Sequence, residues 1–119
     1  MKKTILVIES DAGRRKAMVD VLSAAGYDVI AGDDLGAALQ TVDRLGVDVM
    51  ISDLKLSADT PHGAALERLV QRKQAPPKLL FVSRVPVAAN RAPAHGRDVL
   101  PMPLDRGALL DKVRSLLAG

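Results

Sequence analysis

Short apolar runs alternate with longer amphipathic segments along most of the chain. The first run, TILVI at residues 4–8, carries no charge and is rich in β-branched side chains, which is typical of a strand buried on both faces. Similar runs recur, and the expected strands are residues 4–8, 27–31, 47–52, 78–82 and 99–102. Where the apolar residues between these runs repeat at helical spacing, we expect helices.

The first and last expected helices have clear ends. Residues 12–25 form the first, and Gly26 follows it directly, where a glycine often ends a helix. The last helix begins after Asp105, whose carboxylate can cap the first turn. The side chains expected to face the core are Ala17, Met18, Val21, Leu22 and Ala25 in the first helix and Leu109, Val113, Leu116 and Leu117 in the last.

Strands that alternate with helices predict an α/β fold with a parallel sheet, because each connection must cross back over the sheet. We expect a three-layer, doubly wound, five-stranded parallel sheet in a single domain that spans residues 1–119. Pro86 and Pro93 interrupt residues 84–97, so the fourth helix should be short or absent. Two middle helices complete the pattern, one over residues 34–45 capped by Asp33 or Asp34, and one over residues 63–72 stopped by Pro76 and Pro77.

Composition narrows the possible functions. The chain has no cysteine, so disulfides and thiolate metal sites are excluded. Its net charge of +3 is scattered, and the basic runs at residues 14–16 and 68–73 are interpreted as solvated helix faces. With so few aromatic residues and no clustered basic footprint, we expect no direct nucleic-acid binding. No segment is long and apolar enough for a secretory signal or a membrane span, so we expect a cytoplasmic, soluble protein without membrane contact.

The candidate chemistry lies at the ends of the strands. Phosphate-binding glycine loops, zinc-protease motifs and serine-hydrolase motifs are all absent from the sequence. Glu9 and Asp11 follow the first strand, Asp53 follows the third and Ser83 follows the fourth. In a doubly wound sheet these carboxyl ends form the ligand-binding edge. Asp53 could accept a phosphoryl group there as a nucleophile, or it could be an ordinary loop or capping aspartate.

The succession ILVIESD, GYDVIAGDD, VDVMISDLKL and LLFVS, followed by a proline after the fifth strand, resembles the receiver domain of bacterial response regulators over essentially the whole chain. The resemblance implies a flavodoxin-like fold and a role in two-component, or phosphorelay, signal transduction. It implies a signalling protein rather than an enzyme. The expected partner is a histidine kinase or another signalling protein, and a homodimer is possible.

The resemblance also assigns roles to particular residues. Asp53 falls on the phospho-acceptor and Ser83 on the switch hydroxyl. Glu9 falls on the first residue of an acidic pair that holds Mg²⁺ in the family. The remaining implied metal contacts are Asp53 itself and the backbone carbonyl of Lys55, with Asp11 as a weak further candidate.

Several positions depart from the family pattern. Ser10 replaces the second acidic residue, Met102 replaces a lysine and Val99 replaces the switch aromatic. Ser57 replaces the usual proline, and the loop after Asp53 is two residues longer than is common. Since a charged hydrogen bond contributes about 1.5–3 kcal/mol, these losses predict a degenerate pocket with weak Mg²⁺ binding or none, and weak phosphorylation.

Arg84, directly after Ser83, suggests a substitute cation for the missing lysine, and an exposed loop arginine is the alternative reading. Three functions remain open at this point. The chain could be an atypical receiver phosphorylated on Asp53, a phosphorylation-independent pseudo-receiver that contacts other proteins, or a small-ligand-binding doubly wound domain.

Overall fold

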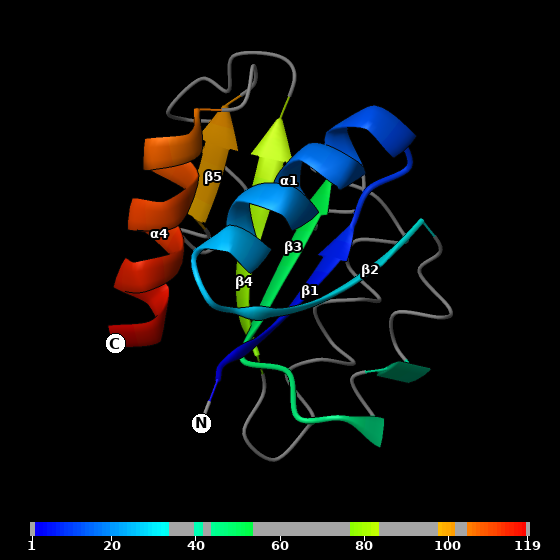
Figure 1. Ribbon diagram of the computed structural model, residues 1–119, viewed down its shortest axis with the longest axis vertical. Coiled ribbons are helices and arrows are strands. Elements are labelled where there is room, and N and C mark those ends of the chain that lie inside the picture. The colour runs from blue at the N-terminus through cyan, green and yellow to red at the C-terminus, as the bar shows by residue number, and fades with distance from the viewer. Residues whose placement is uncertain are drawn as a thin grey trace.

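A single parallel sheet forms the centre of the computed structural model, with the strand order β2-β1-β3-β4-β5 (Figure 1). The strands are β1 (Thr4–Ile8), β2 (Asp28–Gly32), β3 (Val49–Asp53), β4 (Lys78–Ser83) and β5 (Asp98–Pro101), and the helices are α1 (Ala12–Ala24) and α4 (Arg106–Ala118). The structure describes residues 2–33, 40–41, 44–53, 77–83, 98–101 and 105–118.

This strand order confirms the predicted doubly wound α/β fold. From β1 the chain first winds outward to β2 and then returns across β1 to β3, β4 and β5. The direction of winding therefore reverses between β1 and β3, and their carboxyl ends mark the switch point of the sheet. The predicted strand positions are correct to within two residues at each end, with β1 matching at both ends.

Three predictions about helices fall on residues that are not described. The helix predicted for residues 34–45 lies mostly outside the described residues, and the one predicted for 63–72 lies wholly outside them. The same holds for residues 84–97, where we predicted a short or absent fourth helix. The predicted basic face at residues 68–73 is also outside the described part of the chain.

Helices α1 and α4 pack side by side over one face of the sheet (Figure 1). Met18 and Leu22 of α1, with Leu109 and Val113 of α4, are fully buried in one apolar cluster with alternate residues of four strands. The opposite face of the sheet is buried as well, as the exposed fractions of Phe81, Leu6, Ile8 and Met50 show (0–2%). Burial on both faces explains why the strands read as continuous apolar runs.

The predicted core stripes are confirmed in their main members. Leu116 and Leu117 pack against the cluster from α4, and Val21 does so from α1. The prediction was wrong for Ala17 and Ala25, which are exposed. Ala17 lies at the margin of the stripe on α1, and Ala25 is the C-cap residue that follows the last turn of the helix.

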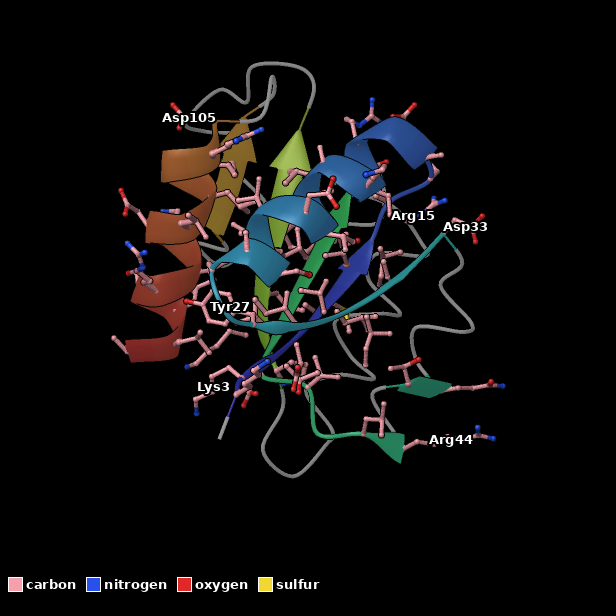
Figure 2. The ribbon with its side chains drawn as sticks, viewed as in Figure 1. Lys3, Arg15, Tyr27, Asp33, Arg44 and Asp105 are labelled. Atoms are coloured by element: carbon pink, nitrogen blue, oxygen red, sulfur yellow. The ribbon has the colours of Figure 1, made fainter. Side chains whose placement is uncertain are left out.

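The ends of the helices follow from local chemistry. Gly26 has a φ of 97°, the conformation that a glycine adopts at least cost. Its amide donates to the Ser23 carbonyl at 3.0 Å, and the Tyr27 amide donates to the Leu22 carbonyl at 3.2 Å, which together form a Schellman motif. Asp105 lies at the start of α4 (Figure 2). The Ala108 amide donates to Asp105 Oδ1 at 3.0 Å, so the predicted cap is confirmed.

Asp48 ties the amino ends of three strands together. Its carboxylate accepts a hydrogen bond from the Thr4 amide at 2.8 Å, and its own amide donates to the Thr4 carbonyl at 2.9 Å. Its carbonyl accepts from the Lys78 amide at 3.0 Å. Asp48 therefore fixes the alignment of β1, β3 and β4 at the end of the sheet opposite the candidate site.

None of the helices in the described ranges is long and apolar enough to cross a lipid bilayer.

Candidate functional site

The strand register brings the sequence-predicted positions to one edge of the sheet. Ile8 is aligned with Ser52, so the next residues, Glu9 and Asp53, follow at the same level. Asp53 is in turn aligned with Val82, directly before Ser83. The backbones of residues 9, 53 and 83 therefore lie along a single edge, as the alternation of elements predicts. The roles of Asp53 and Ser83 stay predictions, since the structure describes their backbone but not their side chains.

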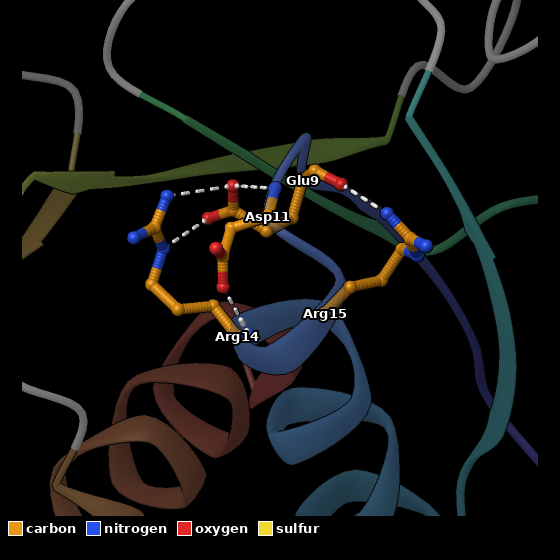
Figure 3. Close-up of polar contacts among 4 residues, drawn as sticks. All are labelled: Glu9, Asp11, Arg14 and Arg15. Carbon is orange, nitrogen blue, oxygen red and sulfur yellow. Dashed lines mark hydrogen bonds and ion pairs between the residues drawn. The ribbon is translucent and has the colours of Figure 1, made fainter.

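Glu9 is the best-defined polar group of this edge. It directly follows β1, and only 1% of its surface is exposed. Its carboxylate accepts a hydrogen bond from Arg14 Nε to Oε1 at 3.0 Å and from Arg14 Nη2 to Oε2 at 3.1 Å. Oε2 also accepts from the Asp11 amide at 3.0 Å. Both carboxylate oxygens are thus bound by protein donors (Figure 3).

The backbone of Glu9 is held as firmly as its side chain. Its amide donates to the Gly32 carbonyl of β2 at 3.0 Å, which extends the pairing of β1 and β2 by one residue. Its carbonyl accepts a hydrogen bond from Arg15 Nη1 at 2.8 Å. In Figure 3 Arg14 and Arg15 approach Glu9 from opposite sides, one at the carboxylate and one at the backbone carbonyl.

The environment keeps Glu9 ionised. Burial by itself would raise the pKa of this carboxyl group, because it disfavours the charged form. The hydrogen bonds from Arg14 and from the Asp11 amide, together with the positive charge of Arg14, outweigh burial and hold the pKa of Glu9 below its ordinary value. The buried carboxylate is therefore stabilised at neutral pH by Arg14 and by the Asp11 amide.

The sequence interpretation of residues 14–16 was wrong for two of its three residues. Lys16 is solvated, as predicted, and pairs with Asp20 along the exposed face of α1 at 2.8 Å. Arg14 and Arg15 are instead half-buried and fold back over the end of β1. The reason is that Glu9 is buried as an anion and needs donors, and the first turn of α1 places two guanidinium groups within reach.

Asp11 caps the first helix. Its backbone is extended and its Oδ2 accepts from the Arg14 amide at 2.8 Å, so it is the N-cap of α1. Ser10, between the two acidic residues, is exposed. Arg14 is thus held at both ends, with its amide bound to Asp11 and its guanidinium bound to Glu9.

The described residues do not fit a resident divalent cation. Magnesium is usually held by one or two carboxylates with water around the rest of the ion. The two carboxylates described near the end of β1 already serve Arg14 and the helix cap, and the position between them is a neutral serine. Within the described part of the chain, no three carboxylate or imidazole side chains are grouped so that they could hold a metal ion.

The other predicted site residues cannot be placed against this network. Lys55, with its implied carbonyl contact, and Arg84, the suggested substitute cation, lie outside the described residues. So do Ser57 and Met102. Val99 lies in β5, and its backbone is aligned with Phe81.

Sequence reasoning missed Arg14 and Arg15 as parts of this edge. A signal for them exists in the sequence, because Glu9 follows a strand that is buried on both faces and so is itself expected to be buried. A buried carboxylate needs a cationic or hydrogen-bonding partner. The nearest cations along the chain are Arg14 and Arg15 in the first turn of α1.

Comparison with known proteins agrees with this architecture. The family model described as "Response regulator receiver domain" matches residues 5–114. A curated relative, the "Response regulator protein FleR" of Pseudomonas aeruginosa, is 30% identical over 115 residues. The match covers 95% of this chain but only 24% of FleR, so the chain spans about a quarter of the length of that relative.

Solved structures share the fold. A response regulator from Thermotoga maritima superimposes with a TM-score of 0.81 at 18% identity, with all of both chains covered. The chemotaxis protein CheY4 of Vibrio cholerae gives 0.82 at 20% identity, covering 98% of this chain and all of that one. A pilus assembly-related protein from Burkholderia pseudomallei gives 0.74 at 27% identity, covering 98% of this chain and 90% of that one.

Proposed function

This chain belongs to the response regulator receiver family of two-component signal transduction, and from that premise we propose that it accepts a phosphoryl group on Asp53 from a histidine kinase. The observation that supports the proposal is the register of the sheet. It sets the backbone of Asp53 at the switch-point edge, beside the end of β1 and one position from Ser83 on β4. Ligands of doubly wound sheets bind at this edge.

In the proposed reaction the carboxylate of Asp53 attacks the phosphorus atom of the donor. A new O–P bond forms as the P–N bond of the kinase phosphohistidine breaks, and the histidine nitrogen leaves with the electron pair. Catalysis of such a transfer depends mainly on positioning and on positive charge near the phosphoryl oxygens. Ser83 is proposed to hold the product phosphate through its hydroxyl, and Arg84 to supply a cation in place of the family lysine.

We expect this transfer to be slow and to depend little on Mg²⁺. Met102 stands where the family has a lysine, and Ser10 stands where it has a metal-binding carboxylate. The Glu9 carboxylate is already bound to Arg14. The acyl phosphate on Asp53 would carry a charge near −2 in place of the −1 of the carboxylate, and its oxygens can draw the Ser83 hydroxyl inward and change the neighbouring surface.

The module is proposed to act in signalling and not as an enzyme, in the cytoplasm, where a kinase or another signalling protein binds it. Formation of a homodimer is part of the same proposal. Size-exclusion chromatography with light scattering, before and after phosphorylation, would detect a dimer.

A second function is favoured by the Glu9–Arg14 pair. In a receiver whose acidic residue is neutralised by its own arginine, that residue binds a metal ion less well. The same fold could then provide a surface for protein contacts that does not depend on phosphorylation. This pseudo-receiver is the principal alternative. A small-ligand-binding domain is the weaker one, since no glycine-rich ligand loop is present in the sequence.

One experiment separates the first two functions. The protein is incubated with phosphoramidate or acetyl phosphate, and its intact mass is followed over time with and without Mg²⁺. The phosphorylated receiver predicts a slow gain of one phosphoryl group that Asp53→Asn abolishes and that Ser83→Ala reduces. No mass gain in the wild-type chain, under conditions that phosphorylate a typical receiver in parallel, would assign the chain to the pseudo-receivers.

A further inference from the structure

The Glu9 carboxylate is already coordinated by a cation that belongs to the chain. The Arg14 guanidinium meets both of its oxygens, at 3.0 and 3.1 Å, in the side-by-side geometry that arginine forms with carboxylates. The Glu9 side chain has no exposed surface, while the Arg14 side chain keeps 21% of its own. The Arg14 guanidinium therefore lies between the Glu9 carboxylate and the solvent.

We propose that Arg14 is a built-in cation that takes the place of a divalent metal ion at the end of β1, so that the chain binds Mg²⁺ poorly and becomes a divalent-cation binder when Arg14 is removed. The inference concerns the charge around Glu9 in the unphosphorylated chain. It does not require that Asp53 be phosphorylated, and it holds equally for the phosphorylated receiver and for the pseudo-receiver.

The local charge balance supports this proposal. Two carboxylates, Glu9 and Asp11, and two guanidinium groups, Arg14 and Arg15, gather around the loop between β1 and α1 (Figure 3). Their formal charges cancel. A hard divalent cation needs a surplus of anionic oxygen ligands to give up its hydration water, and the described groups of this loop offer none.

The residue types suit a permanent cation. Arginine stays protonated at every pH that a folded protein tolerates, whereas a lysine in a half-buried position can lose its proton. Glutamate is one methylene longer than aspartate, and that reach lets the carboxylate at the end of β1 meet a guanidinium on the first turn of α1. Asp11 completes the arrangement by binding the Arg14 amide at 2.8 Å, which sets the direction from which the side chain returns.

The test measures cation binding rather than phosphorylation. The full chain is titrated with Mn²⁺, and the free ion is counted from its electron paramagnetic resonance signal. Mg²⁺ is then added to learn whether it displaces the bound Mn²⁺. We expect weak binding by the wild-type chain and binding about ten- to a hundredfold tighter by Arg14→Gln, the range that corresponds to losing a charge-assisted hydrogen-bonded competitor.

Two further variants define where the ion binds. In the double variant Glu9→Gln with Arg14→Gln, the gained affinity should disappear, because the freed carboxylate is gone. Lys16→Gln removes the same charge from the exposed face of the same helix, and its affinity should stay at the wild-type level. Equal tightening in Lys16→Gln and Arg14→Gln would show a general effect of net charge and would overturn the proposal.

A single variant keeps the proposal testable even if Arg14→Gln fails to fold, which circular dichroism would reveal. Glu9→Gln preserves the size of the side chain and leaves Arg14 in place. Since Glu9 is already occupied by Arg14, this variant should bind Mn²⁺ as weakly as the wild-type chain. A clear loss of affinity in Glu9→Gln, or tight Mn²⁺ binding by the wild-type chain, would mean that Glu9 holds a metal beside Arg14, and the proposal would fail. Phosphorylation of Asp53 could still succeed in that case, so the two proposals fail separately.

Discussion

Replacing Arg14 by glutamine should destabilise the folded chain substantially. The variant leaves the Glu9 carboxylate buried, with 0% of its side chain exposed, and removes the hydrogen bonds of 3.0 and 3.1 Å from the guanidinium. Of the donors to that carboxylate described above, only the Asp11 amide remains. Removing one partner of a buried ion pair costs about 3–5 kcal/mol. Because 21% of the Arg14 side chain is exposed and water can enter the vacated space, we expect a loss near the lower end, about 3 kcal/mol.

A double-mutant cycle measured by urea unfolding at neutral pH tests this reasoning. Glu9→Gln alone should cost less, about 1–2 kcal/mol, since the neutral amide can still accept from Arg14 and the arginine can turn toward water. The double variant should be more stable than the sum of the two single losses predicts, with a coupling of about 2 kcal/mol. Lys16→Gln breaks an exposed pair on the same helix and should leave the unfolding midpoint nearly unchanged.

Two outcomes would refute the argument. If Arg14→Gln shifts the midpoint no more than Lys16→Gln does, the carboxylate is not buried against the guanidinium as described. If the effects of Glu9→Gln and Arg14→Gln simply add, the two side chains do not interact. The slope of the free energy with urea should stay constant through the series, since none of these changes alters the surface exposed on unfolding by much.

Four further outcomes are expected from other described contacts. The pKa of Glu9 lies below its ordinary value of 4.5 in the folded chain. The stability that the ionised carboxylate contributes is therefore fully present above that value and is lost as the pH falls through the folded-state pKa. The free energy of unfolding, measured between about pH 5 and about pH 3, should fall less steeply in Glu9→Gln than in the wild-type chain. Asp105→Ala removes the N-cap of α4 and should cost about 1 kcal/mol, whereas Asp105→Asn should cost less, by thermal denaturation. Asp48→Ala removes the acceptor of the Thr4 amide and should cost about 1.5–3 kcal/mol, with faster hydrogen exchange at that amide as the local readout. Gly26→Ala places a side chain at a φ of 97° and should cost about 1 kcal/mol or more, although no neighbouring atom lies within 4 Å of the added carbon; an unchanged melting temperature would contradict the strain argument.

Much of the fold could be predicted from the sequence because local and tertiary preferences agree. The runs ILVI in β1 and LLFV in β4 are apolar throughout, and a strand buried on both faces accommodates such a run. Gly26 and Asp105 end and begin helices through chemistry that involves their immediate neighbours alone. The bounds of the strands were predicted less accurately than their presence, with β2 displaced by one residue and the start of β3 by two.

The candidate site was only partly predictable, for a physical reason. Glu9 and Asp53 lie at the same level, at the carboxyl ends of β1 and β3. The alternation of strands and helices predicts this placement, because it implies a parallel sheet. The pairing of Glu9 with Arg14 depends instead on how tightly the chain turns between β1 and α1 and on the rotamers of two long side chains. Helical periodicity assigns Arg14 to the polar side of α1 and says nothing of a partner before the helix begins.

The clasp that Asp48 makes at the start of the sheet has a mechanical consequence. Backbone and carboxylate together bind Thr4 at 2.8 and 2.9 Å, and the same residue accepts from Lys78, so three neighbouring strands start from a common anchor. A layer secured in this way resists fraying where its strands begin. We therefore expect β1, β3 and β4 to move together when the opposite edge of the sheet is perturbed, and the helices α1 and α4 that pack on them to move with them.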